Sequence, residues 1–320
     1  MAVHAFIFPG QGSQSVGMGR DLAAAFSAAR EVFEEVDETL GQKLSRIMFE
    51  GPPEELTRTE NAQPALMTHS LAVLRVLERD GGVRLADRAA LVAGHSLGEY
   101  SALAAAGSFT PSAAARLLRL RGLAMQKAVP PGEGAMAALL GAEMPLALEI
   151  CAEAIRTNPP GTTEIVDAAN DNGGGQVVIS GHRGAVERAI EIARGRGVKR
   201  ALLLPVSAPF HCRLMAPAAT AMQDALEKSP PLPPALPLIA NVSAAKVTAP
   251  PEIIRLLVAQ VTATVRWRES VLAMVAMGVD SFVEIGAGRV LAGLVRRIAP
   301  DAATVSLGTP GEIEAFLKTF

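Results

Sequence analysis

Short apolar segments alternate with longer amphipathic segments along almost the whole chain. The first, residues 3–8, is compatible with a β-strand and runs into a polar, glycine-rich loop at residues 9–14. A second apolar segment, residues 89–93, ends at a similar glycine turn, and helical patterns separate the two. Strands buried on both faces of a parallel sheet are continuously apolar, so this alternation predicts an α/β fold with helices on both faces of a mainly parallel sheet.

Helical spacing of apolar residues recurs through much of the chain and predicts most of the other elements. Thr110 followed by Pro111 is typical of an N-cap and a first helical position, and Pro130-Pro131-Gly132 ends the same helix. We predict helices near residues 20–40, 62–80, 97–106, 111–129, 214–227, 251–262, 269–277 and 289–299, a short last helix, and strands at 238–242, 281–285 and near Thr304.

The pattern changes between residues 132 and 205. The predicted elements there are a strand (135–140), a helix (145–157), two strands joined by a glycine turn (164–169 and 176–180), a helix (185–194) and a strand (200–204). This βαββαβ order is typical of a ferredoxin-like subdomain. We therefore predict an α/β-hydrolase-like catalytic domain formed by residues 1–131 and 206–320, with residues 132–205 inserted as a small ferredoxin-like subdomain.

The composition agrees with a compact fold and excludes several classes of protein. The 320 residues are 49% hydrophobic, and 30 basic against 32 acidic residues give a formal charge of -2. This balance argues against a nucleic-acid-binding protein, whose phosphate-contacting face usually makes the domain basic. Two cysteines and five scattered histidines supply neither a disulfide scaffold nor a zinc cluster. Without a signal peptide or an apolar stretch of ~20 residues, we expect a cytoplasmic protein that binds no membrane and no metal.

The segment Gly94-His95-Ser96-Leu97-Gly98 fits the G-x-S-x-G pattern of a nucleophile elbow. An apolar strand precedes it and an alanine-rich helix follows it, which is the strand–turn–helix context that such an elbow requires. The helix N-terminus behind Ser96 offers unpaired N–H groups to a developing oxyanion. We interpret Ser96 as a nucleophile; the alternative is a serine that caps an ordinary helix.

A serine nucleophile needs a base, and His211 is the histidine best placed to supply one. It follows a predicted strand where the chain returns from the subdomain to the larger domain, and a crevice between domains is expected there. The other histidines are His4 in the first strand, His69 in a largely buried helix, His95 on the other side of the turn from Ser96, and His182 in a surface turn.

Arg121 lies on the apolar face of the helix predicted at residues 111–129. Residues at i, i+3 and i+4 spacings place it with Ala114, Leu117, Leu118 and Met125, whereas Arg116, Arg119 and Lys127 project from the opposite face. A buried guanidinium cannot lose its charge and needs an anion, and its planar fork suits a carboxylate. The partner is either a carboxylate of a ligand or an internal Asp or Glu.

Two glycine patterns invite a nucleotide-binding interpretation that the sequence does not support. Gly10-Gln11-Gly12 and Gly286-Ala287-Gly288 each follow a predicted strand, but neither completes G-x-G-x-x-G, and no Walker lysine is present. The run Asn172-Gly173-Gly174-Gly175 is more simply a hairpin turn. We therefore expect no dinucleotide cofactor.

Taken in order, the motifs of the chain resemble those of the malonyl-CoA:acyl carrier protein transacylase family over essentially its whole length. The motifs are GQGSQ at residues 10–14, QPA at 63–65, GHSLGEYSAL at 94–103, RGLAMQ at 121–126, NDNGGGQVVISG at 170–181, PVSAPFHC at 205–212, NV at 241–242 and EIGAGRVLAGLVRRI at 284–298. The resemblance implies roles for several of the matching positions.

The implied catalytic roles are acylated nucleophile for Ser96, general base for His211, oxyanion-hole backbone N–H groups for Gln11 and Leu97, and a backbone carbonyl that orients the histidine for Gln260. The implied substrate-binding residues are Arg121, which would hold the free malonyl carboxylate, and Gln11, Asn170, Met125 and Phe210. The resemblance further implies a ping-pong transfer of malonyl from malonyl-CoA to the phosphopantetheine thiol of acyl carrier protein, by a monomeric enzyme that needs no cofactor.

Acyl carrier protein is acidic, so a net-acidic enzyme must meet it with a local basic patch. Candidate residues are Arg296 and Arg297 in the last long helix, and Arg194, Arg196, Lys199 and Arg200 in the subdomain. The alternative is an ordinary solvated charged surface.

Two positions depart from the pattern usual in free-standing members of the family. Phe210 stands where many bacterial enzymes carry serine, and the bulk of its ring favours malonyl over methylmalonyl. Ala287 replaces the proline of a GPG turn, which bears only on the stiffness of that loop.

Other functions remain open from the sequence. One is a serine esterase, thioesterase or lipase with the order Ser96, Asp167 or Asp171, and His211, although Arg121 argues against it. Another is a non-catalytic module that binds acyl-CoA or a carrier protein. A malonyltransferase of malonate decarboxylase, or a trans-acting acyltransferase of a polyketide pathway, would carry the same motifs.

Overall fold

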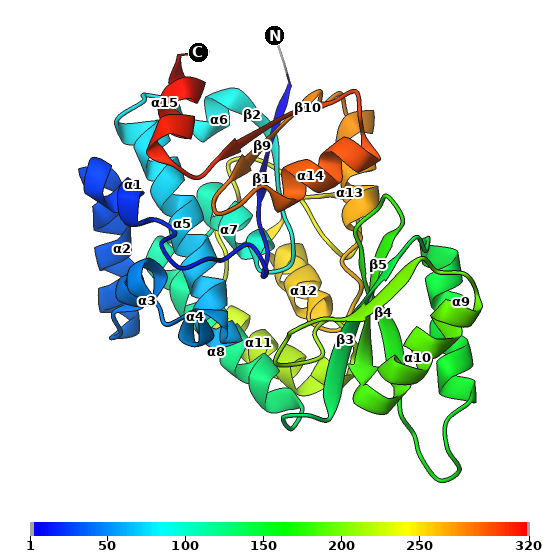
Figure 1. Cartoon of the computed structure of the whole chain (residues 1–320). Helices are drawn as coiled ribbons and strands as arrows, with labels where there is room; N and C mark the ends of the chain where they lie inside the picture. The colour runs from blue at the N-terminus through cyan, green and yellow to red at the C-terminus, as the bar shows by residue number, and fades with distance from the viewer. Residues whose placement is uncertain (1–2, 319–320) are drawn as a thin grey trace.

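The computed structural model describes residues 3–318, and two β-sheets organise this part of the chain (Figure 1). The larger sheet has the strand order β10 (Ala303–Leu307), β9 (Ser281–Ile285), β1 (His4–Phe8), β2 (Ala89–Gly94), β7 (Leu238–Ile239) and β8 (Lys246–Val247). Neighbouring strands are parallel except β7 and β8, which pair in the antiparallel sense. The predicted mainly parallel sheet is confirmed.

Helices cover both faces of the larger sheet, which explains why its strands are continuously apolar. In β1, Phe6 and Phe8 pack into one core cluster, and Ala5 and Ile7 pack into another on the opposite face. The first cluster receives α1 (Arg20–Ala25), α2 (Ser27–Leu40), α3 (Leu44–Glu50), α4 (Pro53–Thr57), α5 (Thr59–Arg79), α6 (Leu85–Arg88), α7 (Gly98–Ala105), α8 (Pro111–Ala128), α11 (Ala216–Lys228), α12 (Pro250–Gln260) and α15 (Pro310–Leu317). The second receives α13 (Trp267–Ala276) and α14 (Val290–Ile298).

The smaller sheet is antiparallel and has the order β4 (Val166–Asp171), β5 (Gln176–His182), β3 (Gly134–Leu140) and β6 (Arg200–Leu203). Along the chain, α9 (Met144–Arg156) follows β3 and α10 (Arg183–Gly195) follows β5, which is the predicted βαββαβ order. Both helices pack on one face and form a separate core cluster with it. The division into two domains at residues 132 and 205 stays a prediction. All strands of the smaller sheet lie between these two positions, and all strands of the larger sheet lie outside them.

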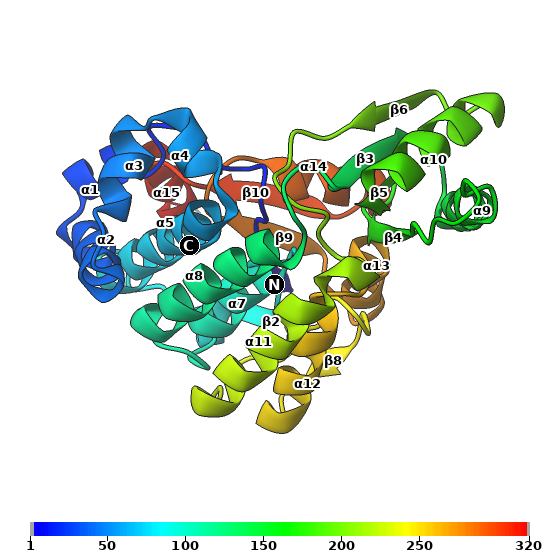
Figure 2. The same ribbon diagram turned by 90° about the horizontal axis from the view of Figure 1, so that it is seen from below.

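One edge of the smaller sheet is attached to the larger part of the molecule. The backbone N–H of Asp171 donates to the carbonyl of Val265 at 2.9 Å, and the N–H of Val265 donates to the carbonyl of Ala169 at 2.9 Å. These bonds hold β4 against the segment between α12 and α13, and Figure 2 shows the smaller sheet with α9 and α10 projecting to one side. The face of this sheet that α9 and α10 leave open is therefore available to line a site.

Several boundaries differ from the prediction. The helix predicted at 20–40 is divided into α1 and α2 because Phe26 adopts an extended conformation, with φ of -128° and ψ of 123°. The strand predicted at 238–242 ends at Ile239, because the chain then turns through Ala244, whose φ is 51°. The short elements α3, α4, α6 and β8 and the 3₁₀ turn at Arg213–Met215 escaped prediction, being too brief to show a periodic pattern.

Among residues 3–318, no helix is both long enough and apolar enough to cross a membrane.

Candidate active site

Ser96 occupies a sharp turn between β2 and α7. Its φ of 55° places it in the left-handed region, which a serine adopts only when the surrounding structure enforces it. A Cβ on Gly94 would lie 1.9 Å from the carbonyl oxygen of Gly98, and a Cβ on Gly98 would lie 2.2 Å from that of Phe8. Both glycines are therefore required by close backbone contacts, and the turn has the geometry of a nucleophile elbow.

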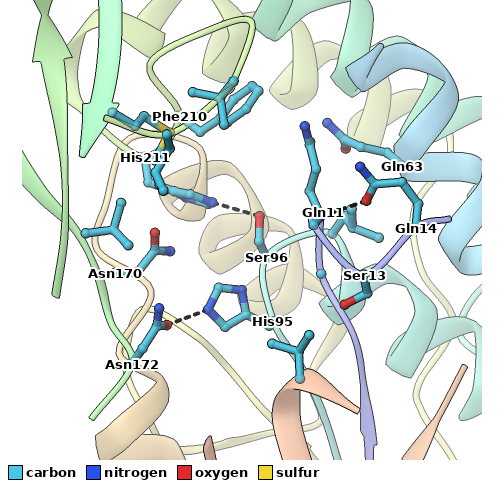
Figure 3. Close-up of a pocket in the computed structure, with 18 of the residues that line it drawn as sticks. Gln11, Ser13, Gln14, Gln63, His95, Ser96, Asn170, Asn172, Phe210 and His211 are labelled. Atoms are coloured by element: carbon cyan, nitrogen blue, oxygen red, sulfur yellow. Dashed lines mark hydrogen bonds between the residues drawn. The ribbon is translucent and has the colours of Figure 1, made fainter. Parts of the chain in front are cut away.

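His211 lies within hydrogen-bonding distance of the serine hydroxyl. Ser96 Oγ and His211 Nε2 are 2.7 Å apart, and His211 Nδ1 is 2.8 Å from the backbone carbonyl of Gln260 (Figure 3). Since a carbonyl can only accept, Nδ1 carries the proton and Nε2 is free to accept the proton of the hydroxyl. Burial, together with the positive charge of Arg121, lowers the pKa of His211 to about 3, so the imidazole is the neutral base at physiological pH.

Within residues 3–318, no carboxylate takes the third position of a hydrolase triad. Asp167 pairs with Arg213 at 2.8 Å, and Asp171 pairs with Arg268 at 3.0 Å. The carbonyl of Gln260 holds the histidine instead. The Ser–Asp–His order considered for an esterase is therefore wrong for this chain.

Arg121 is buried beside Ser96, with a side chain that is 1% exposed. Its Nη1 donates to Gln63 Oε1 at 2.7 Å, and its Nη2 donates to Gln260 Oε1 at 2.8 Å and to Ser96 Oγ at 3.2 Å. All three acceptors are neutral, and no carboxylate within residues 3–318 lies at ion-pair distance from this guanidinium. The alternative of an internal Asp or Glu partner for Arg121 is therefore wrong.

The nearest acidic group to Arg121 along this network is Glu99, which Gln260 separates from it. The side-chain amide of Gln260 donates to Glu99 Oε2 while its oxygen accepts from Arg121. Burial raises the pKa of Glu99 to about 7, so this carboxyl is partly protonated at neutral pH. The positive charge at Arg121 is thus only weakly compensated by the protein.

The helical face predicted for Arg121 is confirmed in α8, where Ala114, Leu117, Leu118 and Met125 are buried with it. Arg116 and Lys127 are exposed. Arg119 departs from the prediction: it is half-buried, and its guanidinium donates to Asn61 Oδ1 at 2.9 Å and to Gln42 Oε1.

The site opens into a cavity of about 550 Å³ between the two sheets. On the side of the larger sheet, its wall is formed by helices and loops and includes Gln11, Leu97, Met125, Phe210 and Leu294, in addition to Ser96, Arg121 and His211. The smaller sheet contributes Met136, Asn170, Gln176 and Val178, and the loop after β4 contributes Asn172. Figure 3 shows Asn170 and Asn172 across the site from Gln11. The structure thus brings together every predicted substrate-binding residue, and the cavity lies at the carboxyl ends of β1 and β2, where sites in α/β sheets form.

Gln11 and Leu97 line this cavity, and the backbone N–H of each has no backbone acceptor among residues 3–318. Leu97 precedes the first residue of α7, so its N–H also lies at the positive end of that helix. This arrangement is what an oxyanion hole requires, and the assignment of these two donors stays a prediction.

Sequence reasoning missed part of the site. His95 borders the cavity, which the sequence did not predict; its Nε2 is 2.9 Å from Asn172 Oδ1, and its ring lies beside Trp267. The position of His95 directly before Ser96 in the Gly94–Gly98 pentapeptide could have indicated that it lies in the site. Gln63 was matched only as part of the QPA motif, and the local pattern did not indicate that its side chain reaches Arg121 from another helix.

The basic residues proposed for carrier docking are exposed but lie in different surroundings. Arg297 borders the cavity and donates to Gln176 Oε1 at 3.1 Å, and Arg296 donates to Thr304 Oγ1 at 2.8 Å. Lys199 and Arg200 are exposed at the start of β6 and do not line the cavity. In the subdomain, Arg194 and Arg196 are engaged by glutamates.

Within the described part of the chain, no three His, Cys, Asp or Glu side chains come together in a group that could hold a metal ion.

Comparisons with known proteins agree with this geometry. The model of the acyl transferase domain family matches residues 5–307. Malonyl CoA-acyl carrier protein transacylase from Bacillus subtilis is 45% identical, covering 100% of this chain and 98% of that protein. The acyl-carrier-protein-S-malonyltransferase from Bartonella henselae is 54% identical, with a TM-score of 0.95 and 99% of each chain covered. A malonyl-transacylase in complex with its type II PKS acyl-carrier protein is 40% identical, with a TM-score of 0.94 and 100% of each chain covered.

Proposed function

The chain belongs to the malonyl CoA-acyl carrier protein transacylase family of acyl transferase domains, and on that premise we propose that it transfers malonyl groups from malonyl-CoA to acyl carrier protein. The acceptor would be the phosphopantetheine thiol of the carrier. The transfer proceeds in two halves through a malonyl ester of Ser96, in a cytoplasmic and monomeric enzyme. No cofactor takes part in either half.

In the first half, Ser96 Oγ attacks the thioester carbonyl of malonyl-CoA while its proton passes to His211 Nε2. The carbonyl oxygen becomes an oxyanion, which the N–H groups of Gln11 and Leu97 stabilise. When the tetrahedral intermediate collapses, the C–S bond breaks and His211 returns the proton to the sulfur of the leaving CoA. The products are CoA and the malonyl-Ser96 ester.

In the second half, the carrier thiol replaces CoA. His211 takes the thiol proton as the sulfur attacks the ester carbonyl, and the same two N–H groups stabilise the second oxyanion. Collapse breaks the C–O bond, and Ser96 Oγ recovers the proton from His211. The carbonyl of Gln260, 2.8 Å from His211 Nδ1, holds the ring in the tautomer that both halves need.

The buried guanidinium of Arg121 supports malonyl as the acyl group most strongly. It lies 3.2 Å from Ser96 Oγ and contacts only neutral acceptors, so an acyl carboxylate would supply the missing countercharge. Met125 and Asn170 would contact the acyl chain beside it. The ring of Phe210, which borders the same cavity, would occupy the space that an α-methyl group requires.

Acylation of Ser96 tests this proposal directly. The protein is mixed separately with malonyl-, methylmalonyl- and acetyl-CoA, and intact mass identifies which acyl group is retained. We expect a malonyl adduct that disappears when carrier protein is added, and no adduct in S96A. Retention of acetyl alone, or loss of the adduct to water before carrier is added, would contradict it.

We further propose that the acidic carrier docks on Arg296, Arg297, Lys199 and Arg200. The position of Arg297 at the cavity border supports this, because the carrier must deliver its thiol into that cavity. Reversing the charge of Arg296 and Arg297 should raise the apparent KM for carrier protein and leave that for malonyl-CoA unchanged. Equal carrier kinetics in the variant would remove these residues from the interface.

A further inference from the structure

A chain of buried polar groups connects Arg121 to the loop after β1. Arg121 Nη1 donates to Gln63 Oε1 at 2.7 Å, Gln63 Nε2 donates to Thr59 Oγ1 at 3.0 Å, and Thr59 Oγ1 donates to Gln11 Oε1 at 3.0 Å. Thr59 is fully buried and Gln63 is 1% exposed. We call these four residues the polar chain.

Each group in the polar chain has one possible role. A guanidinium only donates, so the amide oxygen of Gln63 must accept and its nitrogen must donate. Thr59 Oγ1 accepts that N–H and has a single proton left, which it donates to Gln11. The orientation of the Gln11 side chain is thereby set from Arg121 through two intermediate residues.

Close packing of two helices brings the polar chain together. A Cβ on Gly122 would lie 2.5 Å from Glu60 Cα and 2.7 Å from the carbonyl oxygen of Thr59, so α8 approaches the first turn of α5 through backbone contact. Arg121, which precedes Gly122, therefore reaches the first turns of α5. The hydroxyl of Thr59 is in turn directed to the loop that carries Gln11.

We propose that Thr59 is a positioning residue that aligns the backbone N–H of Gln11 for the oxyanion and couples this alignment to the occupant of Arg121. The bond from Thr59 is the anchor of the Gln11 side chain, and a preoriented donor stabilises an oxyanion better than a mobile one. The coupling to an acyl carboxylate rests on the proposed function, whereas the alignment of Gln11 does not.

A fluorophosphonate tests the alignment without malonyl chemistry. Ser96 Oγ bonds to phosphorus, fluoride leaves, the serine proton passes to His211, and the phosphoryl oxygen takes the oxyanion position. We expect T59V to react about tenfold more slowly than the wild type, the effect of losing the one hydrogen bond from Thr59 Oγ1 to Gln11 Oε1, and T59S to restore the rate. The matched control is T68V, because Thr68 is also buried in α5 and donates to the carbonyl of Pro64 at 2.6 Å, away from the polar chain.

Malonyl-CoA and acetyl-CoA, of which only the first brings a carboxylate to Arg121, then test the coupling. T59V should slow acylation by malonyl more than acylation by acetyl, and equal losses overturn the coupling. Arg121 keeps Gln260 as an acceptor in T59V, so we expect the rate of Ser96 acylation to fall with KM nearly unchanged. A T59V variant that matches T68V with the fluorophosphonate, or that raises KM at an unchanged rate, overturns the positioning role. Failure of the wild type to accept malonyl while the fluorophosphonate difference persists overturns the proposed function and the coupling, and leaves the alignment of Gln11 supported.

Discussion

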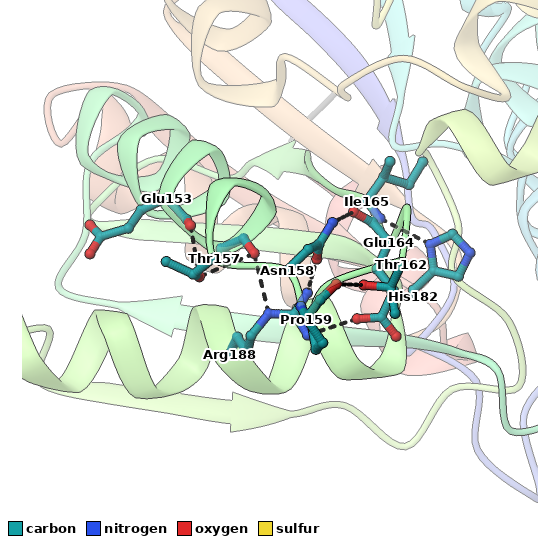
Figure 4. A network of polar contacts seen from close by, with 10 residues as sticks. Glu153, Thr157, Asn158, Pro159, Thr162, Glu164, Ile165, His182 and Arg188 are labelled. Carbon is teal, nitrogen blue, oxygen red and sulfur yellow. Dashed lines mark hydrogen bonds and ion pairs between the residues drawn. The ribbon is translucent and has the colours of Figure 1, made fainter.

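Two arginines, Arg188 beside the smaller sheet and Arg121 beside the larger one, differ in the charge of the groups that surround them. Arg188 in α10 donates to Glu164 Oε2 at 2.7 Å, to the carbonyl of Ala154 at 3.2 Å and to Asn158 Oδ1 (Figure 4). Arg121 is more deeply buried and yet has only neutral acceptors among the described residues. The carboxylate of Glu164 balances the charge of Arg188, whereas Arg121 has no such partner and is able to bind an anion.

The difference separates a cation whose charge is paired within the protein from one whose hydrogen-bond acceptors are all neutral. In the cluster around Arg188, the carboxylate, amide and carbonyl acceptors hold the loop between α9 and β4 against α10, and Asn158 Nδ2 donates back to the carbonyl of Glu164 at 2.8 Å. A buried cation without a countercharge costs stability, so its retention is best explained by a ligand. Degree of burial alone would not distinguish the two roles; the charge of the partners does.

Removal of the Arg121 guanidinium should give the largest effect. In R121A we expect malonyl transfer to fall by about 10²- to 10³-fold, as when one charge-stabilising group is lost from an active site, and acetyl transfer to fall much less. Initial rates with malonyl-CoA and acetyl-CoA measure the two losses. Equal losses for both acyl groups would show that Arg121 does not recognise the carboxylate.

Placing a carboxylate beside Arg121, as Glu164 is placed beside Arg188, should have the next largest effect on malonyl transfer. In Q63E, a carboxylate replaces the amide oxygen 2.7 Å from Arg121 Nη1 and would neutralise the site. We expect KM for malonyl-CoA to rise about tenfold or more, with acetyl transfer affected less, because the internal carboxylate competes with that of the substrate. A Q63E enzyme with the malonyl preference of the wild type would mean that the charge of the partners is unimportant.

Local patterns in the sequence predict the elements that position this site, but not the contacts that tune it. The glycines around Ser96 and the cap at Thr110, whose side chain accepts from the N–H of Ala113, follow from adjacent residues. The partners of Arg121 do not, since Gln63 and Gln260 lie 58 and 139 positions away in the chain. Such contacts depend on how helices pack, which periodicity does not specify.

Loss of the Arg188 guanidinium should destabilise the protein without affecting the chemistry. The ion pair with Glu164 is about three-quarters buried, with side-chain exposures of 24% and 29%, so R188M should lower the free energy of unfolding by about 1 to 2 kcal/mol. R194M is the control in the same helix, because Arg194 is 58% exposed, and it should change the stability by less than about 0.5 kcal/mol. Urea unfolding measures both, and a loss of malonyl preference in R188M would break the distinction between the two arginines.

The smallest effect is expected in the pH dependence, and it follows from the charge on Arg121. Burial and this charge lower the pKa of His211, so the base remains neutral until the pH falls toward about 3. The reaction requires neutral His211, and the rate is therefore lost as the pH falls through that pKa. Removing the positive charge makes protonation easier, so in R121A the acid limb should move upward, on the order of one pH unit.

Acetyl-CoA is the substrate for this measurement, because it lacks the carboxylate that would neutralise Arg121. The rate of Ser96 acylation is followed from about pH 2 to pH 8, a range that includes the acid limb expected near the His211 pKa of about 3, in the wild type, R121A and R188M. Since Arg188 does not line the cavity, R188M should keep the wild-type profile. Superimposable acid limbs in the wild type and R121A would show that the charge on Arg121 does not reach His211, and that its effect is confined to the acyl carboxylate.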